Sequence, residues 1–110
     1  MHRRTLPMAP APRLDLAAPD VAGVVAAAAL LADPIRAGIL RLLRDGPYCV
    51  CEMAAALGAR ENNVSNHLAR LRDAGLVRAG RHRADGRFLY YERDEDAVRG
   101  ARRAVDDVLR

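Results

Sequence analysis

The sequence contains no lysine, no tryptophan, one phenylalanine and two cysteines, and these scarcities narrow its class. Cys49 and Cys51 stand one residue apart, so they cannot form the disulfide framework of a small secreted domain. We therefore expect a reducing, cytoplasmic setting. No apolar run reaches the roughly 20 residues that cross a bilayer, and the nearest, Val21–Ala32, contains Gly23. The sequence thus predicts neither a disulfide scaffold nor a membrane protein.

The length of 110 residues, 51% of them hydrophobic, fits one compact core and not two. Residues 1–18 carry charged residues and prolines without an apolar signal region, which predicts a flexible N-terminal arm and not a signal peptide. Residues 19–110 are then expected to form a single domain.

Positive charge is concentrated in one third of the chain. All 18 basic residues are arginine, and 14 acidic residues leave a formal net charge of +4. Between Arg60 and Arg93, eight arginines stand against four acidic residues, a surplus of +4, so the rest of the chain is neutral overall. This distribution is typical of a surface that faces phosphates.

Start and stop signals predict four helices before residue 76. The second is the best marked, because Asp33 is an N-cap residue, Pro34 suits the first helical position and Gly46 ends the pattern. The first helix has almost no polar face, so we expect it to be buried between other elements. The other three are predicted at Asp20–Leu31, at Val50–Leu57 before Gly58, and at Glu61–Ala74 before Gly75.

The pattern after Gly75 changes from helical to extended. Two strands, Leu76–Arg83 and Arg87–Arg93, are separated by Ala84-Asp85-Gly86, which predicts a hairpin wing. A last helix, Glu95–Leu109, begins after the N-cap Asp94 and carries its apolar residues on one face. The predicted order is α-α-α-α-β-β-α, a mainly helical winged helix-turn-helix with a β-hairpin wing.

The fourth predicted helix has an unusual polar face. Its apolar stripe is formed by Val64, Leu68 and Leu71, and the opposite side is rich in amides. Asparagine is a weak helix former, whereas amides and arginine can pair with adenine and guanine edges in the major groove. We therefore expect DNA contacts from this helix and from the wing, although an ordinary solvated helix and a charged edge strand are the alternatives. The candidate DNA-binding residues are Asn62, Asn63, Ser65, Asn66, His67 and Arg70, with Arg81, Arg83 and Arg87 on the wing.

The cysteine pair is the candidate ion site. Side chains two residues apart on a regular helix point about 200° from each other, so one cysteine must lie outside regular helix. Gly46 and Pro47 interrupt the chain just upstream, which places Cys49 in the connecting turn and Cys51 in the first turn of the short helix. A helix N-terminus lowers the pKa of a thiol placed there, and thiolates bind soft ions. The alternatives are two small buried apolar residues or, with strain, a redox-active disulfide.

These motifs together resemble the ArsR/SmtB family of metal-sensing repressors. The resemblance covers Leu31–Arg93 and rests on Asp33-Pro34-Ile35-Arg36, Cys49-Val50-Cys51-Glu52-Met53, Asn63-Val64-Ser65-Asn66-His67-Leu68, Ala74-Gly75-Leu76-Val77 and Gly86-Arg87 with Tyr90-Tyr91. It implies a homodimer built from the first and last helices, a palindromic operator, and release by an inducing ion. Cys-Val-Cys is similar to the inducer site of arsenic-, cadmium- and lead-responsive members.

The chain departs from that pattern where a third cysteine would follow, because Ala54 stands there. A third ligand would come from His2 or from solvent, or the ion would have no third ligand. The expected inducer is a thiophilic ion, As(III) first and then Cd, Pb or Zn, held by Cys49 and Cys51. Rival interpretations are a repressor that senses oxidants or no ligand, an architectural DNA-binding protein, and a small thiol oxidoreductase. The last lacks a Cys-x-x-Cys motif, so we expect no enzymatic activity.

Overall fold

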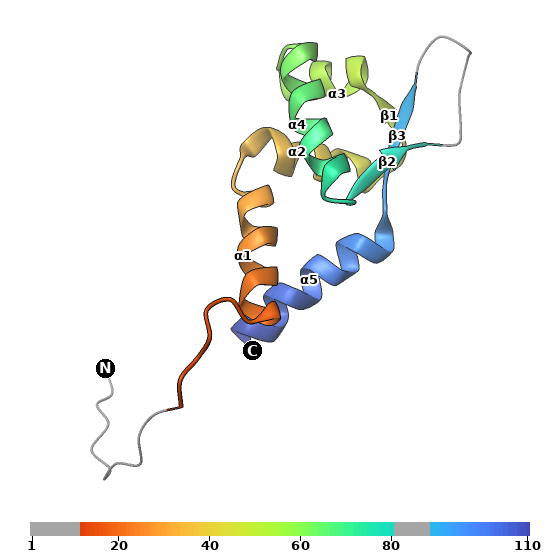
Figure 1. The fold of residues 1–110 in the computed structure, drawn as a ribbon. Coiled ribbons are helices and arrows are strands. Elements are labelled where there is room, and N and C mark those ends of the chain that lie inside the picture. The colour runs from red at the N-terminus through yellow and green to blue at the C-terminus, as the bar shows by residue number, and fades with distance from the viewer. Residues whose placement is uncertain (1–11, 81–88) are drawn as a thin grey trace.

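The computed structural model describes residues 12–80 and 89–110, and all structural statements below concern those residues. They form five helices and three short strands in the order α-α-β-α-α-β-β-α (Figure 1). The helices are α1 (Pro19–Leu31), α2 (Pro34–Leu43), α3 (Val50–Leu57), α4 (Glu61–Asp73) and α5 (Glu95–Leu109), and the strands are β1 (Tyr48–Cys49), β2 (Val77–Ala79) and β3 (Tyr90–Arg93).

Local capping explains the helix boundaries, which agree with the sequence predictions within one residue for α1, α3, α4 and α5. The Asp33 carboxylate accepts hydrogen bonds from the backbone N–H groups of Ile35 at 2.8 Å and Arg36 at 3.3 Å, which begins α2. Asp94 accepts from Ala97 N–H at 3.0 Å and begins α5. Gly58 and Gly75 adopt positive φ angles of 62° and 81°, which end α3 and α4.

The three strands form an antiparallel sheet of order β1-β3-β2. The pairing of β2 with β3 confirms the predicted hairpin, with Val77 opposite Arg93 and Ala79 opposite Tyr91. The predicted order α-α-α-α-β-β-α omitted β1, which pairs Tyr48 with Tyr91 and Cys49 with Tyr90. The described strands are also shorter than predicted, and the predicted tip, residues 81–88, lies outside the described residues.

The core lies where α2, α3 and α4 meet the sheet. Ile39, Met53, Val64 and Leu71 are each 0% exposed, and Leu68 packs with them. The stripe predicted on α4 is therefore its buried face, and Met53 is a core residue as expected. Burying side chains of this size contributes about 1.5–3 kcal/mol each, so this cluster fixes α3 and α4 against the rest of the domain.

Helices α1 and α5 pack on each other, away from the α2–α4 core (Figure 1). The prediction that α1 is buried is wrong for the single chain, because Ala27 is its one buried residue and Val25 is 62% exposed. An apolar helix needs a second surface to cover its whole circumference, and α5 covers only one side. An open groove of about 1040 Å³ lies beside both helices, with apolar residues of each in its lining.

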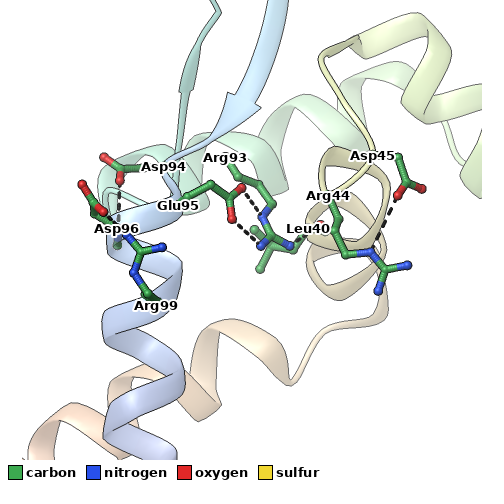
Figure 2. Close-up of polar contacts among 9 residues, drawn as sticks. Leu40, Arg44, Asp45, Arg93, Asp94, Glu95, Asp96 and Arg99 are labelled. Carbon is green, nitrogen blue, oxygen red and sulfur yellow. Dashed lines mark hydrogen bonds and ion pairs between the residues drawn. The ribbon is translucent and has the colours of Figure 1, made fainter.

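Arg93 fixes the direction in which α5 leaves the sheet. Its side chain is 14% exposed, and its guanidinium donates to both carboxylate oxygens of Glu95 at 3.0 and 2.8 Å and to the Leu40 carbonyl at 3.2 Å (Figure 2). An Arg99–Asp96 ion pair lies one turn further along α5 (Figure 2). The start of α5 is thereby tied to the C-terminal half of α2.

The predicted N-terminal arm is described only from residue 12 onward. There Ala18 N–H donates to the Asp15 carbonyl at 2.9 Å, which forms a turn directly before α1. Among the described residues, no single helix is long and apolar enough to cross a membrane, and α1 with α2 passes such a test only as a pair bent by 92°.

Candidate nucleic-acid interface and ion site

Helices α3 and α4 form the predicted helix-turn-helix. Gly58, Ala59 and Arg60 connect them, and the left-handed conformation of Gly58 lets the chain turn sharply. Because α4 buries Val64, Leu68 and Leu71, its opposite side is held outward by the packing. The side chains on that exposed side are Asn62, Asn63, Ser65, Asn66 and Arg70, all predicted DNA-binding residues.

His67 differs from the other predicted DNA-binding residues of α4. It is half-buried, and its Nδ1 lies 3.1 Å from Arg36 Nη1 and 3.7 Å from Asp33 Oδ1. The imidazole therefore engages the start of α2, and it is not part of the freely exposed amide face. A direct contact between His67 and DNA stays a prediction.

The wing residues Arg81, Arg83 and Arg87 lie outside the described residues. At the root of the wing, Arg78 forms ion pairs with Glu92 and Asp94, both at 3.2 Å. Arg72, near the end of α4, lies over the Tyr91 ring at 5.7 Å from its centroid. The Arg72–Tyr91 contact joins α4, the recognition helix, to β3, and the Arg78 ion pairs join β2 to β3 and to the residue before α5.

The two cysteines meet at the start of α3. Cys49 is the N-cap of α3 and also the second residue of β1, while Cys51 lies in the first turn of the helix. This confirms that one thiol lies outside regular helix, although in a strand and not in a turn. The extended backbone of Cys49 brings the Sγ atoms to 2.6 Å from each other, and both cysteines are free. Both sulfurs can therefore reach one ion.

Glu52 closes a capping box with Cys49. The Glu52 carboxylate accepts from Cys49 N–H at 2.9 Å, and the Cys49 sulfur accepts from Glu52 N–H. Sequence reasoning missed Glu52, although a polar N-cap residue followed three positions later by glutamate is the usual signal of this motif. The sulfur that would bind an ion is therefore also the cap of the helix that precedes α4.

The thiol of Cys49 is harder to ionise than the expectation for a helix N-terminus suggests. Burial, the hydrogen bond with Cys51 and the nearby Glu52 carboxylate raise the pKa of Cys49 from 9.0 to about 11, against the lowering effect of Glu52 N–H. Cys49 is only 4% exposed, so desolvation is the largest cause. Its proton must be displaced when an ion binds.

No group of three His, Cys, Asp or Glu side chains positioned for a metal ion occurs among residues 12–80 and 89–110. Ala54, where a third cysteine was sought, is buried in the core. His2, named above as a possible third ion ligand, lies outside the described residues.

A helix-turn-helix with an outward amide face, followed by a β-hairpin, defines a winged helix-turn-helix regulator. The comparisons with known proteins agree. The family model described as "Bacterial regulatory protein, arsR family" matches residues 33–79.

The arsenical resistance operon repressor of Escherichia coli (strain K12) is 34% identical over 82 residues, covering 74% of this chain and 68% of the repressor. An arsenic resistance transcriptional regulator of Pseudomonas putida is 42% identical over 62 residues, 56% of this chain and 46% of the regulator. A solved antimony-specific transcriptional repressor superposes with a TM-score of 0.60 at 34% identity, covering 86% of each chain.

The chain belongs to the ArsR family of bacterial regulatory proteins. Its matched relatives are transcriptional regulators, so it is a DNA-binding regulator and not an enzyme. This removes the thiol oxidoreductase interpretation.

Proposed function

We propose that the chain is a metal(loid)-responsive transcriptional repressor. It binds a palindromic operator as a homodimer in the cytoplasm and is released when a thiophilic ion binds Cys49 and Cys51, with As(III) preferred over Cd, Pb and Zn. The observation that carries the proposal is the meeting of the two Sγ atoms at 2.6 Å, at the start of the helix that precedes the recognition helix. The arsenic- and antimony-linked relatives support a soft ion.

An ion held by both sulfurs binds at the cap of α3. An ion about 2.3 Å from each of two thiolates in tetrahedral geometry holds the sulfurs about 3.8 Å apart, a span that the adjacent Cys49 and Cys51 side chains can provide. Cys49 cannot move without affecting the capping box that it forms with Glu52.

Two short routes lead from the ion to the DNA-binding elements. In one, α3 packs against α4, so a disturbed α3 displaces the amide face. In the other, Cys49 pairs with Tyr90 of β3, the strand that follows the wing tip. Coupling of about 1–3 kcal/mol between two sites is typical and is enough to release an operator.

The uncovered apolar side chains of α1 and α5 support the homodimer, with a second copy of this chain as the occupant. Val25 is exposed on α1, Val108 is 44% exposed on α5, and the groove beside both helices is lined by Leu31 and Leu109 among others. Apolar side chains left exposed together on neighbouring helices mark an interaction site. Residues 19–110 then serve both DNA binding and dimerisation.

The test is a titration of a protein–DNA complex with ions. The DNA is a fluorescent duplex enriched by the chain from a random-sequence library, and separate titrations use As(III), Sb(III), Cd, Pb and Zn. Release of the wild type by at least one ion, with retention of the Cys49→Ser/Cys51→Ser variant, supports the proposal. Val50→Ala, which leaves both thiols in place, is the matched control and must respond like the wild type. Indifference of the reduced wild type to every ion contradicts the ion-sensing role and leaves DNA binding intact.

The contact between two free thiols also favours a second candidate, a repressor that senses oxidants. In that case diamide releases the DNA, dithiothreitol restores binding, and thiophilic ions have no effect. The same complex therefore distinguishes the two candidates.

A further inference from the structure

Arg36 is the one buried charged side chain among the residues that the structure describes, at 7% exposure. Its Nε donates to the Leu30 carbonyl at 2.7 Å and its Nη2 donates to the Ala29 carbonyl at 3.0 Å. Both carbonyls belong to the last turn of α1, where C=O groups lack the usual partner four residues later, and Ala29 also accepts from Ala32 N–H at 3.4 Å. Arg36 therefore attaches the C-terminal end of α1 to the first turn of α2.

The third contact of Arg36 reaches the recognition helix. Arg36 Nη1 lies 3.1 Å from His67 Nδ1, in the middle of α4. A guanidinium only donates hydrogen bonds, so Nδ1 is the acceptor in this contact. One buried side chain thus bonds to two elements beside its own, α1 and α4.

Asp33 completes this cluster from the start of α2. Its carboxylate lies 3.7 Å from the same Nδ1 and accepts from the backbone N–H groups of Ile35 and Arg36. Burial acts to raise the pKa of Asp33, but those two hydrogen bonds and the charge of Arg36 hold it below 3.8. The carboxylate is therefore ionised and balances the buried guanidinium.

This cluster bears on the position of the amide face, the exposed side of α4 that carries Asn62, Asn63 and Asn66. Helix α1 packs on α5 at the face proposed for dimer contact, and α4 presents the amides to DNA. Two recognition helices of a dimer must match half-sites about 34 Å apart, so small rotations of α4 relative to α1 alter the fit. Arg36 and His67 form a direct polar link between these two helices.

We propose that Arg36 and His67 are positioning residues for operator recognition, which hold α4 at a fixed place relative to α1. The proposal rests on the proposed DNA-binding function. Arg36 is buried and acts through His67, so its effect on operator affinity is transmitted and not a direct DNA contact. Substitution then lowers specific binding more than binding to random DNA, since phosphate contacts tolerate a displaced helix.

The experiment measures the affinity of each variant for the library-enriched duplex and for a random duplex of equal length. All measurements are made at a temperature where circular dichroism shows the variants fully folded. Arg36→Gln and His67→Leu are expected to lose about tenfold in specific affinity, within the range reported for residues that couple sites without touching ligand. His67→Asn, which retains an acceptor near the position of Nδ1, is expected to recover most of that loss.

A double-substitution cycle separates positioning from a direct contact of His67 with DNA. If the pair acts as one link, Arg36→Gln/His67→Leu loses no more affinity than either single variant. Additive losses, or a folded Arg36→Gln with wild-type specific affinity, overturn the proposal. Should Arg36→Gln fail to fold, the comparison of His67→Leu with His67→Asn decides alone, because equal losses in the two contradict the role of Nδ1 as acceptor. If the wild type shows no preference for the enriched duplex over the random duplex, the proposed DNA-binding function itself is refuted. That outcome differs from a failure of the positioning proposal, in which the wild type keeps its preference.

Discussion

The raised pKa of Cys49 predicts how ion affinity depends on pH. A shift from 9.0 to about 11 corresponds to roughly 3 kcal/mol, or about a hundredfold in affinity, that a cation must supply to displace the Cys49 proton. Because this thiol is protonated at neutral pH, each unit of rising pH favours Cd²⁺ binding at least tenfold between pH 6 and 8.

As(III) is expected to behave differently because it enters as neutral As(OH)₃. Each thiol proton leaves with a hydroxide of the arsenous acid as water, while an As–O bond breaks and an As–S bond forms. No net proton is released, so As(III) affinity stays nearly constant over the pH range in which Cd²⁺ affinity climbs. The affinity of the same pair of sulfurs thus rises with pH for Cd²⁺ and stays nearly constant with pH for As(III).

The assay is a competition titration at several pH values, followed by the ultraviolet absorption of the thiolate–ion bond. Cys49→Ser serves as the control and is expected to lose most of the Cd²⁺ slope that comes from this residue. A Cd²⁺ affinity that is flat from pH 6 to 8, with both thiols free, refutes the assignment of a protonated Cys49 as ligand.

Three further predictions follow from the same contacts. The raised pKa of Cys49 stabilises the folded ion-free chain below pH 9.0, and this contribution is lost as pH rises toward 11. Urea unfolding should therefore show the stability gap between the wild type and Cys49→Ala shrink by about 2 kcal/mol between pH 9 and 11, and a constant gap contradicts the shift. Asn63→Ala removes an exposed amide from the amide face of α4 and should weaken specific DNA binding by about 1–3 kcal/mol in a fluorescence anisotropy titration. Asp73→Ala, at the end of the same helix, should leave specific binding unchanged. Val108→Glu places a charge on the proposed dimer face and should give a monomer in sedimentation equilibrium, whereas the exposed Leu89→Glu outside that face should stay dimeric.

Features encoded over a few residues were predictable from the sequence. Asp33 followed by Pro34 defines the start of α2, and Gly58 and Gly75 define the ends of α3 and α4, because capping depends on neighbours within one turn. The amide face of α4 was predictable for the same reason, since the buried stripe fixes which side points outward.

Features that depend on distant residues were not predictable. Strand β1 has two residues, too few for a periodic pattern, and exists through pairing with β3 some forty residues later. The direction of His67 depends on Arg36, which precedes it by 31 residues. A helix N-terminus lowers the pKa of a thiol through local dipoles, whereas burial and the Glu52 carboxylate, which raise the pKa of Cys49, depend on how the whole chain packs.

The alanine-rich α1 illustrates a third case. Its composition predicted burial, yet the single chain leaves Val25 uncovered while α5 shields one side only. Composition reports that an apolar surface requires a partner, but it does not say whether that partner is the same chain or another copy.

The central claim is that ion binding at Cys49 and Cys51 and DNA binding by the amide face of α4 are energetically linked. Thermodynamic reciprocity between the two binding events tests this claim most directly. The dissociation constant of Cd²⁺ is measured for the free protein and for the protein saturated with its enriched duplex. The account predicts weaker Cd²⁺ binding on DNA, by the same factor by which Cd²⁺ weakens the DNA complex. An identical Cd²⁺ affinity in both states would contradict it.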